Sequence, residues 1–356
     1  MKKHLLVISL LLLISCSSAP DEIKIGVVAP LSGPVAQFGE FMKLGFDLAV
    51  EEINAAGGID GKNVRLIYED SKCIDQKALL SALNKLKDID QVAGVLGPFC
   101  GTENVVAGQF ATDNKMFIIA PGDNFGPNST HKVNTRYLIS KEAELLAQYA
   151  LSKGWKRLGV LSFNNEWGQA YHTVIRDYLA THGGEVVIAE FYDYSSLDVR
   201  TPLLKIKEAK PDAVVFIDAL TGELFTQVRE IGLDVPLISE WEIENAAPSV
   251  LESGALDGVV YALPVTERTL FHDSFKAKYD QEPNVVHIDS YDAAKIMGDA
   301  LRACPGYEPD CMVEKVTSLR DYKGAGGPMT FNKTLWAFDR PFVYKTVVNG
   351  SFVPLS

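Results

Sequence analysis

The chain has 356 residues, of which 47% are hydrophobic and 22% are charged. This length exceeds that of an ordinary single domain and suits two. The formal net charge of −12 argues against nucleic acid or an anionic membrane surface as the partner.

The N-terminal residues have the pattern of a secretory signal peptide. Lys2 and Lys3 precede an apolar run, residues 5–14, that is too short to span a bilayer, and a polar stretch follows it. We therefore expect residues 1–15 to be removed on export. The sequence Leu-Ile-Ser-Cys at the end of the run resembles the lipobox of bacterial lipoproteins, so Cys16 is expected to carry a lipid anchor, with residues 16–22 as a tether. The alternative is an ordinary signal peptide with an incidental cysteine.

Four further cysteines are expected to form disulfides. Export places Cys73, Cys100, Cys304 and Cys311 in an oxidising compartment. Of the three possible pairings, Cys73–Cys100 with Cys304–Cys311 is the most local. A metal site is the other possibility, but no Cys-x-x-Cys spacing or histidine cluster supports one. We expect neither a metal nor another cofactor.

From residue 23 onward, short apolar runs alternate with helical patterns. Continuous apolar runs are typical of parallel strands that are covered on both faces. Four βα units in series predict a parallel sheet with right-handed crossovers. Strands are expected at 23–30, 63–70, 92–98 and 116–122, and helices at 41–54, 76–87 and 102–114.

A second series of the same kind follows, and a hairpin ends the chain. Helices are expected at 141–153, 167–181, 198–209 and 221–231, and strands at 157–163, 185–192, 212–219, 235–241 and 258–265. Helices near 268–280 and 288–303 come next. The last segment alternates as an antiparallel hairpin does, with Asn349-Gly350 as its turn. The predicted fold class is therefore α/β, with two doubly wound parallel-sheet lobes.

Two turns at strand ends are candidates for a binding site. The third strand runs through residues 97–102 into a helix, and the fourth ends in residues 120–124. In open α/β sheets, ligands bind beyond the carboxyl ends of the strands, where helix N-termini present free N–H groups to anions. Two such corners facing a second lobe predict a cleft that holds a small molecule.

The segment 23–61 is similar to the opening of the type I periplasmic substrate-binding proteins, in the leucine/isoleucine/valine-binding family. The similar motifs are PLSGxxAxxG, the helix end INAAGGI and the strand end EDSKCID. The resemblance continues through GVLGPFCGT and IIAPG and, more weakly, through PDAVVFIDA, IGLDVPLISE and DSYDAAKIM. It therefore covers nearly all of the chain after residue 22.

This resemblance implies a type I periplasmic binding protein fold, in which two lobes joined by a three-strand hinge close over a ligand and then dock on the permease of an ABC transporter. The crossings are expected near 137–140, 263–266 and 332–338. Lobe 1 would comprise 22–138 plus 265–334, and lobe 2 would comprise 139–264 plus 335–356. The family also implies a monomer, and a disulfide between the second strand and the turn after the third, where Cys73 and Cys100 stand.

In amino-acid-binding members of this family, two turns bind the ligand's carboxylate. The corresponding residues here are Cys100, Gly101, Thr102, Gly122, Asp123 and Asn124. Gly101 replaces a frequent serine and Asn124 a usual threonine. Asp123 fits less well, because a second negative charge beside a bound carboxylate is unfavourable.

The second lobe of the family supplies aromatic side chains and a carboxylate for the ligand's ammonium group. Asp218 and Glu240 stand at strand ends and are candidates to pair with a cation, on which Trp241 would stack. The further aromatic candidates are Phe38, Trp167 and Tyr291.

Two other function classes compete with a solute receptor. An enzyme is disfavoured, because the sequence has no nucleophile-elbow, phosphate-loop, dinucleotide or zinc-protease motif, and its histidines are scattered. An exported lipoprotein sensor or regulator of the same fold would act through protein–protein contacts. A cleft lined by aromatic and carboxylate side chains favours the receptor. The predicted function is therefore to bind an amino acid or related small polar compound and deliver it to an ABC-type permease.

Overall fold

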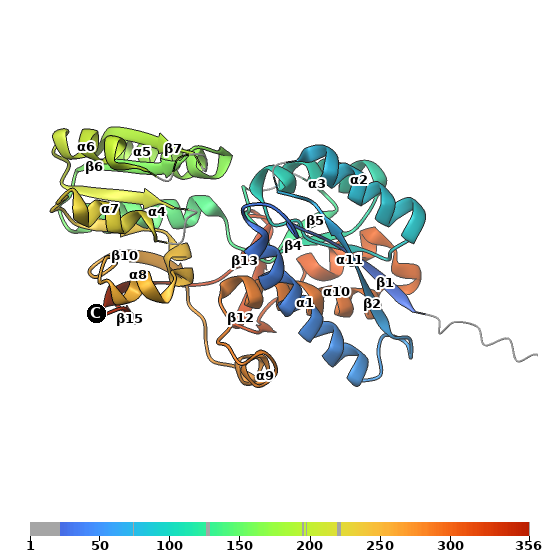
Figure 1. The fold of residues 1–356 in the computed structure, drawn as a ribbon. Helices are drawn as coiled ribbons and strands as arrows, with labels where there is room; N and C mark the ends of the chain where they lie inside the picture. Colours follow the sequence, from blue (N-terminus) through green and yellow to red (C-terminus); the bar gives the residue numbers. More distant parts are fainter. Residues whose placement is uncertain are drawn as a thin grey trace, which may run out of the picture.

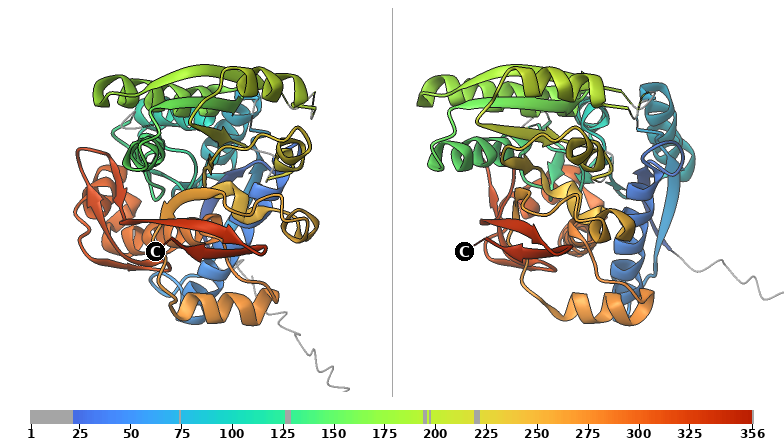
Figure 2. Two further views of the ribbon diagram at one scale, coloured as in Figure 1. Left: turned by 90° about the vertical axis from the view of Figure 1, so that its left-hand side faces the viewer. Right: turned by 60° about the vertical axis from the view of Figure 1, so that its left-hand side comes forward.

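The structure of the chain, a computed structural model, describes residues 22–355 except 74, 126–128, 194, 195, 197 and 219–221. These residues form two lobes, each built on one sheet with helices packed against it (Figure 1, Figure 2). The predicted signal peptide and Cys16 lie outside the described residues. Within the described part, no helix combines the length and the apolar character that crossing a membrane requires.

Within the described residues, the first lobe contains an eight-stranded sheet in the order β11-β12-β13-β5-β4-β3-β1-β2. Its parallel part consists of β1 (Ile23–Ala29), β2 (Val64–Asp70), β3 (Val95–Leu96), β4 (Ile118–Ala120) and β5 (Lys132–Asn134). An antiparallel extension consists of β11 (Tyr322–Gly324), β12 (Gly327–Asn332) and β13 (Ala337–Asp339), and β13 joins it to β5.

Helices cover both faces of this sheet, because the side chains of β1 are apolar on both. Ile25 and Val27 belong to the core that includes α1 (Ala36–Ala55) and α10 (Val285–Ala303), and Val28 belongs to the core under α2 (Gln76–Asn84) and α3 (Gly101–Asn114). The remaining elements of this lobe are η1 (Lys85–Asp90), α9 (Leu270–Tyr279), η3 (Pro305–Tyr307) and α11 (Pro309–Thr317).

The second lobe contains a seven-stranded sheet in the order β15-β14-β10-β9-β8-β6-β7, again counted over the described residues. Its strands are β6 (Arg157–Phe163), β7 (Glu185–Tyr192), β8 (Ala213–Ile217), β9 (Leu237–Ser239), β10 (Val260–Pro264), β14 (Phe342–Val348) and β15 (Ser351–Pro354). Its helices are α4 (Ile139–Ser152), α5 (Glu166–His182), α6 (Arg200–Glu208), α7 (Leu224–Glu230), η2 (Trp241–Asn245) and α8 (Pro248–Glu252). The first five strands pair in parallel, and β14 and β15 form the predicted C-terminal hairpin.

The chain passes between the two sheets three times. The passages lie between β5 and α4, between β10 and α9, and between β13 and β14. The last one falls at Arg340 and Pro341, beyond the expected 332–338, and β13 belongs to the first sheet although residues 335–356 were assigned to lobe 2. The physical reason is that β12 and β13 pair as an antiparallel hairpin, which returns the chain to the first sheet before it crosses.

Candidate ligand-binding cleft

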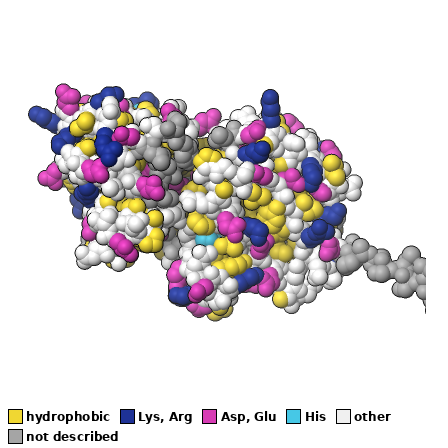
Figure 3. All heavy atoms as spheres, viewed as in Figure 1, with side chains coloured by type: hydrophobic (Ala, Val, Ile, Leu, Met, Phe, Trp, Pro, Cys, Tyr) yellow, Lys and Arg dark blue, Asp and Glu magenta, His cyan; other side chains and the backbone are white. Residues whose placement is uncertain are grey.

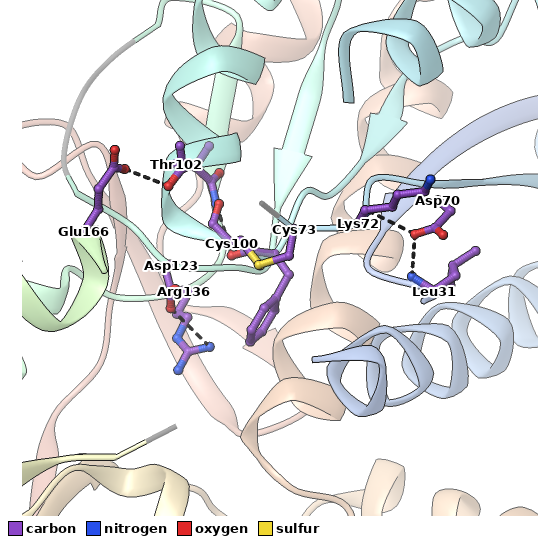
Figure 4. The surroundings of a disulfide bond; sticks show 11 residues. Leu31, Asp70, Lys72, Cys73, Cys100, Thr102, Asp123, Arg136 and Glu166 are labelled. Carbon is purple, nitrogen blue, oxygen red and sulfur yellow. Dashed lines mark hydrogen bonds and ion pairs between the residues drawn. A yellow bond between two sulfur atoms is a disulfide. The ribbon is translucent and has the colours of Figure 1, made fainter. Parts of the chain in front are cut away.

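Among the described residues, two hydrogen bonds connect the lobes away from the chain crossings. Thr102 Oγ1, at the N-terminus of α3, donates to Glu166 Oε2 at the N-terminus of α5 over 2.6 Å (Figure 4). Asn284 Nδ2, before α10, donates to Asn245 Oδ1 in η2 over 2.9 Å. We call these the interlobe hydrogen bonds. They show that the two lobes are in contact beside the strand-end residues of the cleft.

The turn after β3 is fastened to the neighbouring strand end. Cys73 and Cys100 form a disulfide that connects the segment after β2 to the N-terminus of α3 (Figure 4). The second predicted pair, Cys304–Cys311, is also present, so the structure confirms both pairings. Gly97 has a φ of 99°, and a Cβ there would lie 2.0 Å from the Val28 carbonyl oxygen. Only glycine fits this turn without strain.

Two glycines leave no room for side chains in the two corners. A Cβ on Gly101 would lie 2.0 Å from Cε2 of Phe125, and a Cβ on Gly122 would lie 1.9 Å from the Phe99 carbonyl oxygen. The Phe125 ring therefore takes the space that a serine at position 101 would need. At these two positions the corners therefore present backbone groups and no hydroxyl.

Asp123 lies in the corner at the start of α3. Its backbone N–H donates to the Phe99 carbonyl over 2.7 Å. Its side chain lies 3.9 Å from Nη1 of Arg136 (Figure 4). Burial raises the pKa of Asp123 to about 6, although Arg136 and the Gly101 N–H both favour its ionised form.

Arg136 is the charged centre of the cleft, and the sequence analysis did not select it. Its side chain is 2% exposed. Its guanidinium carbon lies 5.6 Å from the ring centroids of Phe99 and Tyr137 and 4.7 Å from that of Trp241. Rings from both lobes thus surround this cation. The ring of Trp241, predicted to stack on a cation of the ligand, faces a cation of the chain itself.

Glu142 is a second buried charge that the sequence analysis missed. It is fully buried and accepts hydrogen bonds from the hydroxyls of Tyr137 and Tyr171, over 2.6 and 2.8 Å, and from the backbone N–H of Trp241 over 3.2 Å. Burial raises its pKa to about 7 against the effect of these donors. These hydrogen bonds fix the start of η2 against α4.

The carboxyl ends of β8 and β9 carry further buried carboxylates. Asp218 accepts hydrogen bonds from the Tyr192 hydroxyl and the Gly222 N–H, over 2.7 and 2.9 Å. Glu240 accepts from the Glu242 N–H over 2.6 Å through Oε2, whereas its fully buried Oε1 has no hydrogen-bond partner in the described part of the chain.

Glu242 completes the acidic side of the cleft and was also missed. Its side chain is buried in η2. Burial raises the pKa of both Glu240 and Glu242 well above the usual value, and each is raised further by neighbouring carboxylates, among them Asp218 and Glu142.

The other predicted ligand residues have partners within the chain. Phe38 stacks on Phe99 with a centroid distance of 4.9 Å, and Trp167 makes an edge contact with Tyr171. Asn124 donates from Nδ2 to the Arg136 carbonyl over 3.3 Å. Tyr291 lies between α1 and α10, away from the strand ends, where its hydroxyl donates to Glu52.

The mouth of the cleft contains a pocket of about 390 Å³ between the two lobes. Phe125 contributes to it from the first lobe and α4 and α5 from the second, with Glu166 at its edge. Among the described residues, no group of three or more histidine, cysteine, aspartate or glutamate side chains is arranged to hold a metal ion.

A weak signal for Arg136 exists in the sequence. It directly precedes the predicted crossing at 137–140, and a residue at a crossing borders both lobes. Glu142 and Glu242 carry no such signal, because a glutamate within a helical pattern is usually a solvated residue. Only the packing of η2 against α4 buries them together.

Two α/β lobes that are joined by three crossings and bring charged side chains together between them define a two-lobed binding protein. The comparison with known families specifies which kind. Residues 22–347 match the model described as periplasmic binding protein, so the chain belongs to that family. Membership identifies it as a substrate-binding protein rather than an enzyme, as predicted.

Two characterised relatives are similar over most of the chain. The leucine-, isoleucine-, valine-, threonine- and alanine-binding protein of Pseudomonas aeruginosa is 24% identical over 313 residues, which cover 84% of this chain and 83% of that protein. The Leu/Ile/Val-binding protein of Escherichia coli K12 is 26% identical over 302 residues, which cover 82% and 78%.

Solved structures share the fold. The leucine-binding protein LivK of Thermotoga maritima superposes with a TM-score of 0.83 at 20% identity, over 94% of this chain and 98% of that one. A solute-binding protein of an ABC transporter from Rhodopseudomonas palustris, in complex with 3,4-dihydroxybenzoic acid, has a TM-score of 0.83 at 20% identity, over 94% and 97%. These likenesses confirm the predicted type I periplasmic binding protein fold.

Proposed function

We propose that this chain is an exported receptor that encloses an amino acid or a related small polar compound between its lobes and delivers it to an ABC-type permease. The observation that carries this proposal is the meeting of charged and aromatic side chains from both sides of the cleft. Asp123 and Arg136 lie at the first sheet's strand ends, opposite Trp241 and Glu242. A ligand that contacts both sets favours the closed form by its differential affinity.

The relatives support a small polar ligand. Those named above bind aliphatic amino acids, and a structural neighbour holds an aromatic acid. Acidic and basic side chains are interspersed over both lobes on the face seen in Figure 3. This mixed surface, with the negative net charge, is in keeping with a small ligand rather than nucleic acid.

Export and anchoring are part of the same proposal. Removal of residues 1–15 and acylation of Cys16 would anchor a monomeric receptor to the cell envelope, on the periplasmic side or at the outer face of the cell membrane, beside its permease. Mass spectrometry of the mature protein tests this directly: a lipid mass on Cys16 supports the anchor, and a chain cleaved elsewhere without a lipid contradicts it.

The binding function is tested by a thermal-shift screen of residues 17–356 against amino acids, amines, amides, urea and small carboxylates. A ligand at a hundred times its dissociation constant adds about 2.7 kcal/mol to the free energy of unfolding, which raises the melting temperature by a few degrees. Small-angle X-ray scattering of each positive compound then measures closure as a smaller radius of gyration.

The matched variants are Glu242→Gln, in the cleft, and Glu252→Gln, on the exposed face of α8. We expect only the first to reduce the thermal shift. If no compound stabilises the folded protein or contracts it, the receptor proposal is wrong and a regulator that acts through protein–protein contacts is favoured.

A further inference from the structure

We propose that the ligand is a cationic amine or amidine that lacks a carboxylate, because Asp123 already occupies the corner where a ligand's carboxylate would bind. This inference rests on the proposed receptor function and specifies its ligand class. The corner is formed by the N-terminus of α3, whose free N–H groups and dipole favour an anion. The anion found there belongs to the chain.

The Asp123 carboxylate is a fixed part of this corner. The backbone N–H of Asp123 donates to the Phe99 carbonyl, its carboxylate lies 3.9 Å from Nη1 of Arg136, and the Gly101 N–H favours its ionised form. Its residue is 7% exposed. A ligand carboxylate would therefore be held beside a buried negative charge, where repulsion is weakly screened.

The corner also has no hydroxyl to offer an anion at its first two helical positions. A side chain at Gly101 would collide with the Phe125 ring, and the Thr102 hydroxyl is engaged by Glu166 across the cleft. Neither of these two positions thus offers a free hydroxyl to a ligand carboxylate.

The opposite wall requires a donor with positive charge. Glu240 Oε1 is completely buried and lacks a hydrogen-bond partner in the described residues, and the Glu242 carboxylate lies beside it. Asp123 and Glu242 neighbour the Arg136 guanidinium, whereas the charged neighbours of Glu240 are the carboxylates of Glu242, Glu142 and Asp218. Burial keeps protons on Glu240 and Glu242 in the ligand-free protein. An ammonium or amidinium group supplies both a counter-charge and hydrogen-bond donors, so it would bind their ionised forms as those protons leave.

The positive charge of Arg136 does not make this cleft suited to a ligand carboxylate. Its charge is balanced by Asp123, Asp289 and Glu242, and its face is covered by Trp241. Its Nη1 has no hydrogen-bond partner among the described residues and suits a neutral acceptor on the ligand, such as a hydroxyl or carbonyl oxygen.

The test compares amines with the amino acids that differ from them only by a carboxylate. Isothermal titration calorimetry of residues 17–356 isolates the effect of the carboxylate. The pairs are isoamylamine and leucine, putrescine and ornithine, agmatine and arginine, and tyramine and tyrosine. We expect the amine of the bound pair to have a dissociation constant at least about tenfold lower than its amino acid.

Asp123→Asn removes the charge and keeps the shape, so it should reduce this amine preference at least about tenfold. The control is Asp273→Asn, an exposed carboxylate on α9 that pairs with Arg268 and should leave the preference unchanged. Because the wild-type comparison needs no variant, the inference can be tested even if Asp123→Asn does not fold.

The outcomes separate the two proposals. Binding of an amino acid or other carboxylate as tightly as its amine overturns the inference and leaves the receptor function intact. An amine preference that survives Asp123→Asn overturns the role of Asp123. If no compound of the whole screen binds, both the receptor function and this inference are wrong.

Discussion

Arg136 illustrates how a single residue can organise the interior of a binding protein. It lies between rings of both lobes, and the Coulomb contributions of Asp123, Asp289 and Glu242 all favour its charged form. A guanidinium suits this position, because it stays protonated and stacks on flat rings. Without it, the surrounding carboxylates would be buried with no counter-charge.

At this scale we predict that Arg136→Met lowers the free energy of unfolding by about 3 kcal/mol at pH 7, as breaking a buried ion pair usually does. The matched control is Arg302→Met, whose guanidinium is exposed and pairs with Asp299 on the same helix. Thermal or urea unfolding monitored by circular dichroism measures both. Equal stability of Arg136→Met and wild type would show that the cleft carboxylates do not depend on this cation.

At the scale of elements, the two disulfides have different tasks. Cys73–Cys100 joins two strand ends of the cleft across 27 residues, whereas Cys304–Cys311 closes a turn of 7 residues after α10. The first therefore constrains both the unfolded chain and the position of α3.

We predict that replacing both cysteines by serine costs about 3.5 kcal/mol for the first pair and about 2.5 kcal/mol for the second, in a loop-entropy model. Urea denaturation of the two double variants measures which disulfide contributes more to the free energy of unfolding. Only the first should also weaken ligand binding, because Cys100 is the N-cap of α3. A larger loss for the second pair would contradict the dependence on loop length.

The interlobe hydrogen bonds connect helix ends rather than cores. The bond from Thr102 to Glu166 is exposed, so its contribution to closure is small. We predict that Glu166→Ala increases the radius of gyration of the ligand-free protein and weakens ligand binding about two- to fivefold. Glu144→Ala, on the exposed face of α4, is the control. A radius that changes equally in both variants would argue against a role in closure.

The whole molecule carries an excess of buried carboxylates. Burial raises the pKa of Glu103 to about 8 and that of Glu142 to about 7, and those of Glu240 and Glu242 are also raised. The folded protein thus binds protons that the unfolded chain, with pKa values of about 4, has already released. Folding stability must fall as pH rises through this interval.

We predict that the melting temperature of the ligand-free protein rises when the pH is lowered from 8 to 6. For each such group, the free energy of unfolding should increase by on the order of 1 kcal/mol per pH unit over this interval. Burial acts in the opposite direction on Lys132, His172, His272 and His287: it lowers the pKa of Lys132 to about 7, that of His287 to about 3, and those of His172 and His272 below their usual value. The carboxylates with raised pKa values also include Asp123 and Asp289, each at about 6, so they outnumber these groups. Calorimetry at pH 8, 7 and 6 measures the sign, and Glu103→Gln should flatten the slope. A melting temperature that falls toward pH 6 would contradict the assignment.

Much of the architecture could be predicted from local pattern alone. The apolar runs at residues 23–30 and 157–163 are β1 and β6, and Asn349-Gly350 forms the turn between β14 and β15. Such elements are predictable because side-chain periodicity and turn chemistry are local properties. Short elements were missed because they depend on non-local contacts. The three residues of β5 form a strand only because a neighbouring strand pairs with them.

The candidate site was predictable only in part. The positions of the strand-end turns followed from the chain order of strands and helices, so Gly101, Asp123 and Glu240 could be chosen as candidates. The neighbours of each of these side chains could not be predicted. Asp123 lies against Gly101 and Arg136 because three separate segments converge there, and Tyr291 is directed toward Glu52 because α10 packs on α1.

The sequence by itself therefore determined the class of fold, the cysteine pairs and the strand ends at which a ligand can bind, since these follow from periodicity, spacing and resemblance. The tertiary structure alone decided how the charges are distributed in the cleft. Whether a carboxylate is solvated, hydrogen-bonded or buried beside another depends on contacts between residues far apart in the chain, and its ionisation depends on those contacts. That arrangement, with Asp123 at the start of α3 and Glu240 opposite it, is what distinguishes this cleft.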